Sequence, residues 1–154
     1  MVVEAAGRIV WTGTDFNDPV GSIPEGGGAP QFHPVLSTDA CSRPVFAVGP
    51  SIYLYGRVLP AGPFGLISHN ISTGASSMVI QEAGIGSLGD YFVSADGILA
   101  DVSGEVRAFD LQGNNPAFVA ELPANSTGRY LDDQVVMWTE LEDDTWTLFI
   151  NERP

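Results

Sequence analysis

The sequence contains no lysine, and its six arginines stand against 19 acidic residues, for a formal net charge of −13. Nucleic-acid-binding proteins neutralise phosphates with basic side chains, and anionic membranes attract basic segments. We therefore exclude nucleic acids and membrane surfaces as partners. The acidity favours solubility first, and cationic partners or metal ions second. Loss of lysine with arginine retained is typical of the coding bias of GC-rich bacteria.

Cysteine and histidine are nearly absent. Cys41 is the single cysteine, so the chain forms no internal disulfide and no cysteine-based metal cluster. We interpret Cys41 as a small buried residue rather than a reactive thiol. The two histidines, His33 and His69, are expected to be structural or surface residues rather than catalysts. The sequence has neither the Gly-x-Ser-x-Gly motif of a nucleophile nor a Gly-Lys-Ser/Thr phosphate loop, and we assign no catalytic residue.

Long hydrophobic runs and long helical patterns are also missing. No apolar run reaches the roughly 18 residues of a membrane span. No segment has the ten or so residues of 3.6-residue periodicity that are typical of a helix. The composition, with 44% hydrophobic residues, 18 glycines and 11 prolines, is that of a turn-rich globular chain. At 154 residues, one domain is the default expectation.

The clearest pattern lies in residues 91–122. Aromatic and β-branched residues open it at Tyr91-Phe92-Val93, and such residues suit a pleated sheet. Asp96-Gly97 is a strong hairpin signal because glycine tolerates a positive φ. Two further turn sequences follow, Asp101–Gly104 and Gln112–Pro116. The stretch therefore predicts four short strands joined by tight turns.

Weaker copies of this pattern flank it. Asn70-Ile71, Asp110-Leu111 and Asn151-Glu152 fall at equivalent places near the end of a third strand, 40 and 41 residues apart. A period near 40 residues with four strands per repeat is typical of a β-propeller. The pattern resembles the blades of TolB-like, NHL-like and WD-type propellers over most of residues 44–151, without a Trp-Asp dipeptide or another diagnostic motif. The resemblance implies an all-β fold of about four four-stranded blades, and it carries no functional residue.

The repeats divide the chain into a single propeller-like domain of five segments. These are a closing strand at 1–7, an irregular blade at 8–43, a blade at 44–83, a blade at 86–122 and an incomplete blade at 125–154. Residues 1–7 resemble 78–84, an outer strand, and we expect them to have no sheet of their own and to pair beside Thr147–Asn151. The alternatives are a partial propeller completed by another chain, and a β-sandwich of the same strands.

Acidic residues provide the candidate binding site. In a propeller, the turns between second and third strands share one face with the fourth-to-first connections, which places several carboxylates there together with the insertion from Asp15 to Pro30. Carboxylates are suitable ligands for a divalent cation such as calcium, although a solvated hairpin tip is the favoured interpretation and we assign no metal ligand or cofactor. Asp15–Asp18 opens like a calcium loop, but Pro19 occupies its third ligand position. The candidates are Asp101, Glu140, Glu142, Asp143, Asp144, Asp15, Asn17 and Asp18.

Three functions remain open from the sequence. The first is a non-catalytic binding or assembly module that presents a propeller face to a protein or glycan partner. The second is a glycan- or ester-processing hydrolase or lyase that uses channel carboxylates. The third is a structural subunit whose ring is completed by another chain, with association through unpaired strand edges. The localisation stays open, with an extracellular or cell-envelope place favoured. We expect Trp11 and Trp138 to pack between sheets rather than to stack on sugars.

Overall fold

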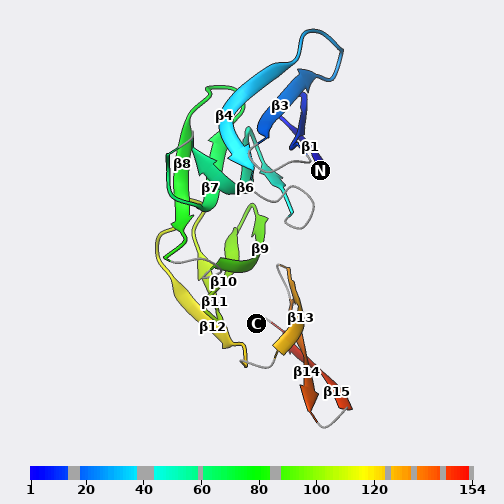
Figure 1. Ribbon diagram of the computed structural model, residues 1–154, viewed down its shortest axis with the longest axis vertical. Coiled ribbons are helices and arrows are strands. Elements are labelled where there is room, and N and C mark those ends of the chain that lie inside the picture. The colour runs from blue at the N-terminus through cyan, green and yellow to red at the C-terminus, as the bar shows by residue number, and fades with distance from the viewer. Residues whose placement is uncertain are drawn as a thin grey trace. The chain divides into compact units, whose positions relative to one another are not determined.

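The computed structural model describes residues 1–13, 18–37, 44–58, 61–83, 88–123, 126–132, 135–142 and 145–152 (Figure 1). These residues form 15 strands and no helix, so the all-β prediction is confirmed. No helix of the described residues is long and apolar enough to cross a membrane. The chain divides into two compact units, Met1–Glu82 and Ala83–Pro154.

The first unit begins with a meander of four antiparallel strands, β1 (Val2–Ala5), β2 (Arg8–Trp11), β3 (Pro19–Pro24) and β4 (Gln31–Ser37). Ala6 and Gly7 connect β1 to β2 with φ angles of 54° and 68°, which suit a two-residue hairpin. The prediction that residues 1–7 have no sheet of their own is therefore wrong, because β1 pairs with β2 along its whole length. A short hairpin closes at a small entropic cost, whereas the likeness to residues 78–84 reflects only shared strand composition.

The second meander contains β5 (Phe46–Val48), β6 (Ser51–Val58), β7 (Gly65–Asn70) and β8 (Ser76–Gln81). These are the four strands expected within residues 44–83. The first residues of β6 pair with β5, and its last three residues pair with the end of β4. The long β6 thereby joins the two meanders into one eight-stranded sheet, a connection that the sequence did not predict.

The second unit contains a four-stranded and a three-stranded sheet. The third meander consists of β9 (Leu88–Ser94), β10 (Gly97–Val102), β11 (Glu105–Phe109) and β12 (Ala117–Glu121), and it matches the pattern of residues 91–122. The last meander consists of β13 (Ser126–Leu131), β14 (Val135–Glu142) and β15 (Thr145–Glu152). None of the sheets formed by these described strands closes on itself.

Two of the positions that set the 40-residue spacing have side chains that accept hydrogen bonds from the turn that follows them. Asn70 is the last residue of β7, and its Oδ1 accepts hydrogen bonds from the backbone N–H groups of Ser72 and Thr73 at 3.0 and 2.9 Å. Asp110 follows β11, and its Oδ1 accepts from Gln112 and Asn114 at 3.0 and 2.8 Å. Both side chains thus build the turn that follows a third strand, which is a common use of asparagine and aspartate.

Each unit buries its own apolar cluster. In the first unit the cluster joins β1–β4 to β6 and β7, and its buried members are Ala5, Val10, Val20, Val35, Ile52, Leu54, Ile67 and Ile71. In the second unit it joins the third meander to the last one, through Leu99, Val106, Ala120, Leu122, Leu131 and Val136. Consecutive meanders within a unit therefore share an apolar core, as stacked β layers do.

Candidate functional site

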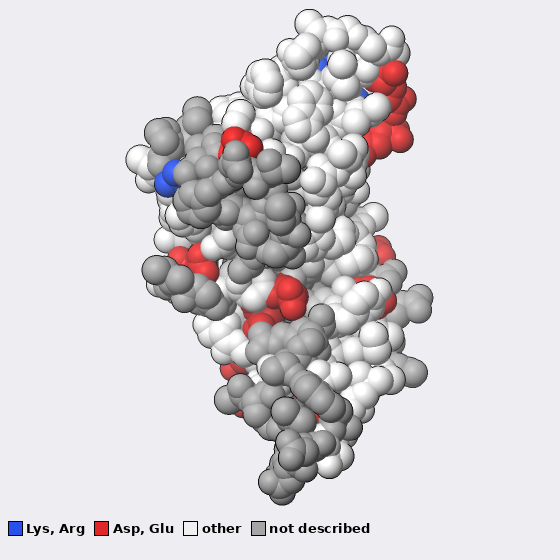
Figure 2. All heavy atoms as spheres, turned by 45° about the vertical axis from the view of Figure 1, so that its right-hand side comes forward, with Lys and Arg blue, Asp and Glu red and all other residues white. Residues whose placement is uncertain are grey.

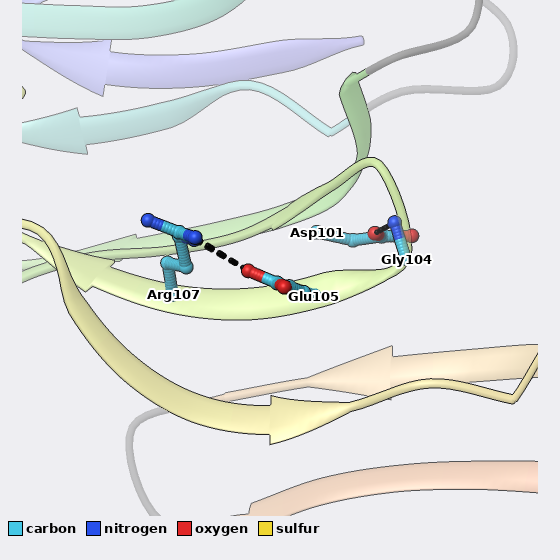
Figure 3. Close-up of polar contacts among 4 residues, drawn as sticks. All are labelled: Asp101, Gly104, Glu105 and Arg107. Atoms are coloured by element: carbon cyan, nitrogen blue, oxygen red, sulfur yellow. Dashed lines mark hydrogen bonds and ion pairs between the residues drawn. The ribbon is translucent and has the colours of Figure 1, made fainter.

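Asp101, the first candidate binding residue, lies in β10 just before the turn into β11 and is only 2% exposed. Its Oδ1 accepts a hydrogen bond from the backbone N–H of Gly104 at 2.9 Å (Figure 3). The carboxylate also lies over Gly89, where an added Cβ would come within 2.3 Å of its Oδ2. Asp101 thus shapes its own turn. The neighbouring ion pair of Glu105 and Arg107 in Figure 3 is partly exposed and contributes little stability.

Replacing Asp101 tests this structural role. We expect Asp101→Ala to lower the free energy of unfolding by about 1–2 kcal/mol, because the partly buried N–H of Gly104 loses its acceptor. Asp101→Asn keeps an oxygen at the same place and is the matched control, expected to recover most of the loss. Urea denaturation of the two variants measures the difference. Equal stability of the alanine variant and the wild type would contradict the role.

The other acidic candidates do not form a described cluster. Glu140 lies in β14, where its Oε1 accepts a hydrogen bond from Trp138 Nε1 at 2.9 Å. Asp18 is described, and it lies against Gly13. Glu142 belongs to β14 but its side chain is outside the described set, as are Asp15, Asn17, Asp143 and Asp144 altogether. Cys41 is outside it as well. Within the described part of the chain, no three His, Cys, Asp or Glu residues form a group able to hold a metal ion.

The two histidines form a buried polar chain in the first unit. His33 Nδ1 and His69 Nε2 lie 2.9 Å apart, although 36 residues separate them in the sequence. Ser22 Oγ lies 2.8 Å from His33 Nε2, and Ser76 Oγ lies 2.7 Å from His69 Nδ1. Arg8 Nε donates to Ser22 Oγ at 2.9 Å. The chain therefore links β2, β3, β4, β7 and β8 across the core, in line with the expected structural role.

Burial keeps both imidazoles neutral near pH 7. His69 is fully buried, and burial, with His33 as a neighbour, lowers its pKa to about 4. Burial also lowers the pKa of His33, with Arg8 as a second cause. Two arrangements of the N–H groups satisfy this chain, and in both only one proton lies between the two rings. A network this enclosed stabilises the sheet and is closed to substrates.

The first meander exposes apolar side chains on the side opposite its core. We call this surface the first outer face and define it by Val2, Ile9, Trp11 and Phe32. Val2 and Phe32 are 64% and 62% exposed. Val2 pairs with Trp11, and Gly21 pairs with both Trp11 and Phe32, so these residues form one row across the sheet.

Trp11 forms a flat platform in the middle of this row. Its indole ring covers Gly21, where an added Cβ would lie 2.4 Å from ring atoms. Phe32 meets the indole edge to face, with 6.4 Å between ring centroids. Among the described residues, Trp11 thus contacts Gly21 and Phe32 of its own sheet. The Trp11 ring can lie this close to the backbone of β3 only because residue 21 is a glycine.

A pair of carboxylates borders the first outer face. Glu4 of β1 pairs with Ile9 of β2. Glu25, in the turn after β3, interacts with Glu4. A hydrogen bond that the protonated Glu25 carboxyl donates to the Glu4 carboxylate, together with the negative charge of Glu4, raises the pKa of Glu25. A shallow hollow beside the pair is lined by Val2, Val3, Glu4, Ile9 and Glu25. The first outer face is thus apolar in its centre and acidic at one side.

The last meander exposes a second apolar surface. We call it the last outer face and define it by Tyr130, Met137, Leu148 and Ile150. Tyr130 and Ile150 both pair with Met137, and Leu148 is two residues from Ile150 on the same side of β15. Leu148 and Ile150 are 58% and 57% exposed. The opposite side of the sheet, with Leu131 and Val136, packs into the core of the second unit.

Strand β15 also presents an edge. Among the described strands, β15 is hydrogen bonded to β14 alone. The last meander has three described strands, whereas each of the other meanders has four. Phe149 stacks on Trp138 with 5.3 Å between ring centroids, which anchors β15 on its inner side. The edge of β15 and the last outer face therefore lie next to each other in the last meander.

No protein family model and no curated protein matches this chain. The two outer faces are the features that sequence reasoning missed. The alternation in Thr145–Glu152 was visible and places Leu148 and Ile150 on the more apolar side of the strand. An alternating pattern predicts that the apolar side is buried, so the sequence did not reveal that this side remains exposed.

Proposed function

We propose that this chain is a non-catalytic binding or assembly module, with its four meanders as the blades of a propeller-type repeat, and that it holds a protein partner. The observation that carries the proposal is the last outer face, an apolar sheet surface beside a strand edge. Contiguous exposed apolar surface of this kind is typical of interaction sites. The turns at Asn70 and Asp110, which occupy equivalent places in two meanders, support the repeat.

The alternative of a glycan- or ester-processing enzyme requires carboxylates that face a substrate. Asp101 is buried and accepts a hydrogen bond within its own turn. Glu140 accepts one from Trp138. Both side chains thus have structural partners, which favours a binding role over an acid–base role. The aliphatic character of Leu148 and Ile150 favours a protein partner over a glycan, since sugars are bound mainly by aromatic and polar groups.

Site-specific photo-cross-linking tests the proposal. We expect benzoylphenylalanine at position 148 to give a defined protein adduct in the cells that produce the protein, because Leu148 lies in the centre of the proposed surface. The same residue at Gln112, in the exposed turn after β11, is the matched control and is expected to give none. Adding Ile150→Glu to the position-148 variant is expected to abolish the adduct. Equal labelling at both positions, or an adduct that survives Ile150→Glu, would contradict the proposal.

A further inference from the structure

We infer that the buried polar chain of Ser22, His33, His69 and Ser76 is an acid-sensitive link between the first and second meanders. When the pH falls, the two meanders separate at this link and expose the apolar layer between them, before the strands inside each meander come apart. The link belongs to the first unit alone, and it is independent of any partner of the last outer face.

The polar chain lies in the same layer as the apolar cluster of the first unit. Side chains two residues apart on a strand point to the same side, so His33 of β4 shares its side with the buried Val35. His69 of β7 likewise shares its side with the buried Ile67. One half of the cluster comes from the first meander and the other half from the second. The buried His33–His69 hydrogen bond, 2.9 Å long, crosses this layer.

The strand pairing that joins the two meanders is short. Among the described strands, β4 of the first meander pairs with β6 of the second over its last three residues alone. Inside the second meander, β6 pairs with β7 over the six residues from Ser51 to Gly56. The apolar layer and the polar chain therefore supply much of the cohesion between the meanders. A local opening at such a boundary costs less free energy than unfolding of the whole unit.

The contact between the two rings has room for one proton. His33 Nδ1 lies against His69 Nε2, so one nitrogen donates and the other accepts. If both rings are protonated, both of these nitrogens carry a hydrogen, and two cations repel each other where the hydrogen bond was. If one ring is protonated, a positive charge enters the apolar layer, and burial opposes it. Each proton that the rings take up therefore favours the separated meanders.

The described surroundings of the rings do not compensate such a charge. Burial, Arg8 and the neighbouring ring lower the two pKa values, and no described carboxylate is among the causes. Many acidic side chains lie instead on the surface that Figure 2 shows. Once the meanders separate, water solvates both imidazolium ions. The neighbours of the two rings on the surrounding strands are Arg8 of β2, Ser22 of β3, Ile52 of β6 and Ser76 of β8.

Residue-resolved hydrogen exchange on the full chain locates the opening. The amides of the β4–β6 pairing report separation of the meanders, and those of the β6–β7 pairing report unfolding of the second meander. We expect the β4–β6 amides to be the less protected at every pH. After correction for the intrinsic pH dependence of exchange, their protection is expected to fall about 20-fold or more between pH 7.5 and pH 5, because His69 takes up a proton in the opened state and not in the closed one.

A carboxylate beside His69 separates the role of the ring from a general effect of acid. Ser76→Asp places a negative charge next to the imidazolium, which stabilises the protonated ring in the closed state. We expect the fall in protection to be at least about five-fold smaller than in the wild type. Ser77→Asp is the matched control, because Ser77 is the next residue of β8 and is exposed, and it is expected to keep the wild-type pH profile.

Three results would overturn the inference. The first is protection of the β4–β6 amides that does not change between pH 7.5 and pH 5. The second is equal protection of the β4–β6 and β6–β7 amides, which means that the unit opens as a whole. The third is a wild-type pH profile in Ser76→Asp. If Ser76→Asp misfolds by circular dichroism, His69→Gln replaces it with the same expected result, because glutamine takes up no proton. The cross-linking at position 148 tests the proposed function separately.

Discussion

Lowering the pH from 6.5 towards 4 is expected to destabilise the first unit by up to about 3 kcal/mol through His69 alone. An unfolded histidine binds its proton near pH 6.5, whereas burial lowers the pKa of His69 in the folded state to about 4. Between these values the unfolded chain takes up a proton that the folded chain does not. The stabilisation is therefore fully present above pH 6.5 and is lost as the pH falls. Hydrogen exchange across the first unit at several pH values measures the loss.

The surroundings of the two rings determine the direction of this effect. Arg8 reaches Ser22, which contacts His33, and its positive charge disfavours protonation there. At the other end of this polar chain, the uncharged Ser76 hydroxyl contacts His69. His33→Gln combined with His69→Gln is the control, expected to be less stable than the wild type at pH 7 and less sensitive to acid. An unchanged slope of stability against pH in that variant would show that the histidines do not cause the effect.

Gly65→Ala is expected to cost about 3 kcal/mol, which is at the upper end for overpacking of a tight interior. Gly65 begins β7 and pairs with Gln81 of β8. An added Cβ would lie 2.1 Å from the carbonyl oxygen of Ile80 and 2.8 Å from Met78 Sδ. A carbonyl oxygen held in a sheet cannot move aside like a side chain, so β7 and β8 must separate. Chemical denaturation of the purified variant measures the cost.

Gly26→Ala is the matched control for this substitution. Gly26 lies in the loop after β3, and an added Cβ there meets nothing within 4 Å. We expect its stability to stay within about 0.5 kcal/mol of the wild type. If both substitutions lower the free energy of unfolding by a similar amount, the loss is a general effect of replacing glycine. The close approach of β7 to β8 would then not be its cause.

The sequence predicted the local strands and turns of residues 91–122 well. Tyr91–Val93 and Asp96-Gly97 predicted a strand and a hairpin, and the structure has β9 and β10 there. The spacing of Asn70 and Asp110 also had a physical basis, since both side chains close the same kind of turn. These features depend on contacts within a few residues, which short sequence patterns encode directly.

The sequence predicted the roles of the candidate binding residues and of the first strand much less well. Asp101 was expected on a binding face, whereas it is buried in β10 and accepts a hydrogen bond from the turn that follows. The same residue types that bind cations also accept hydrogen bonds from turn backbones. Residues 1–7 were expected to close a propeller ring as an outer strand without a sheet of its own, whereas the Ala6–Gly7 hairpin pairs β1 with its neighbour β2. Acidic residues and short strands are both ambiguous in isolation, and their neighbours decide their roles.

By itself, the sequence determined the all-β class, the turn-rich strands and the acidic surface, because composition and two-residue alternation act locally. Only the tertiary structure decided which apolar side chains stay exposed and which polar ones are buried. Phe32 and Ile150 remain on the surface, whereas His33 and His69 meet in the core. The physical reason is that burial depends on pairing between strands far apart in the sequence, and a slip of one residue in that pairing would exchange the two faces.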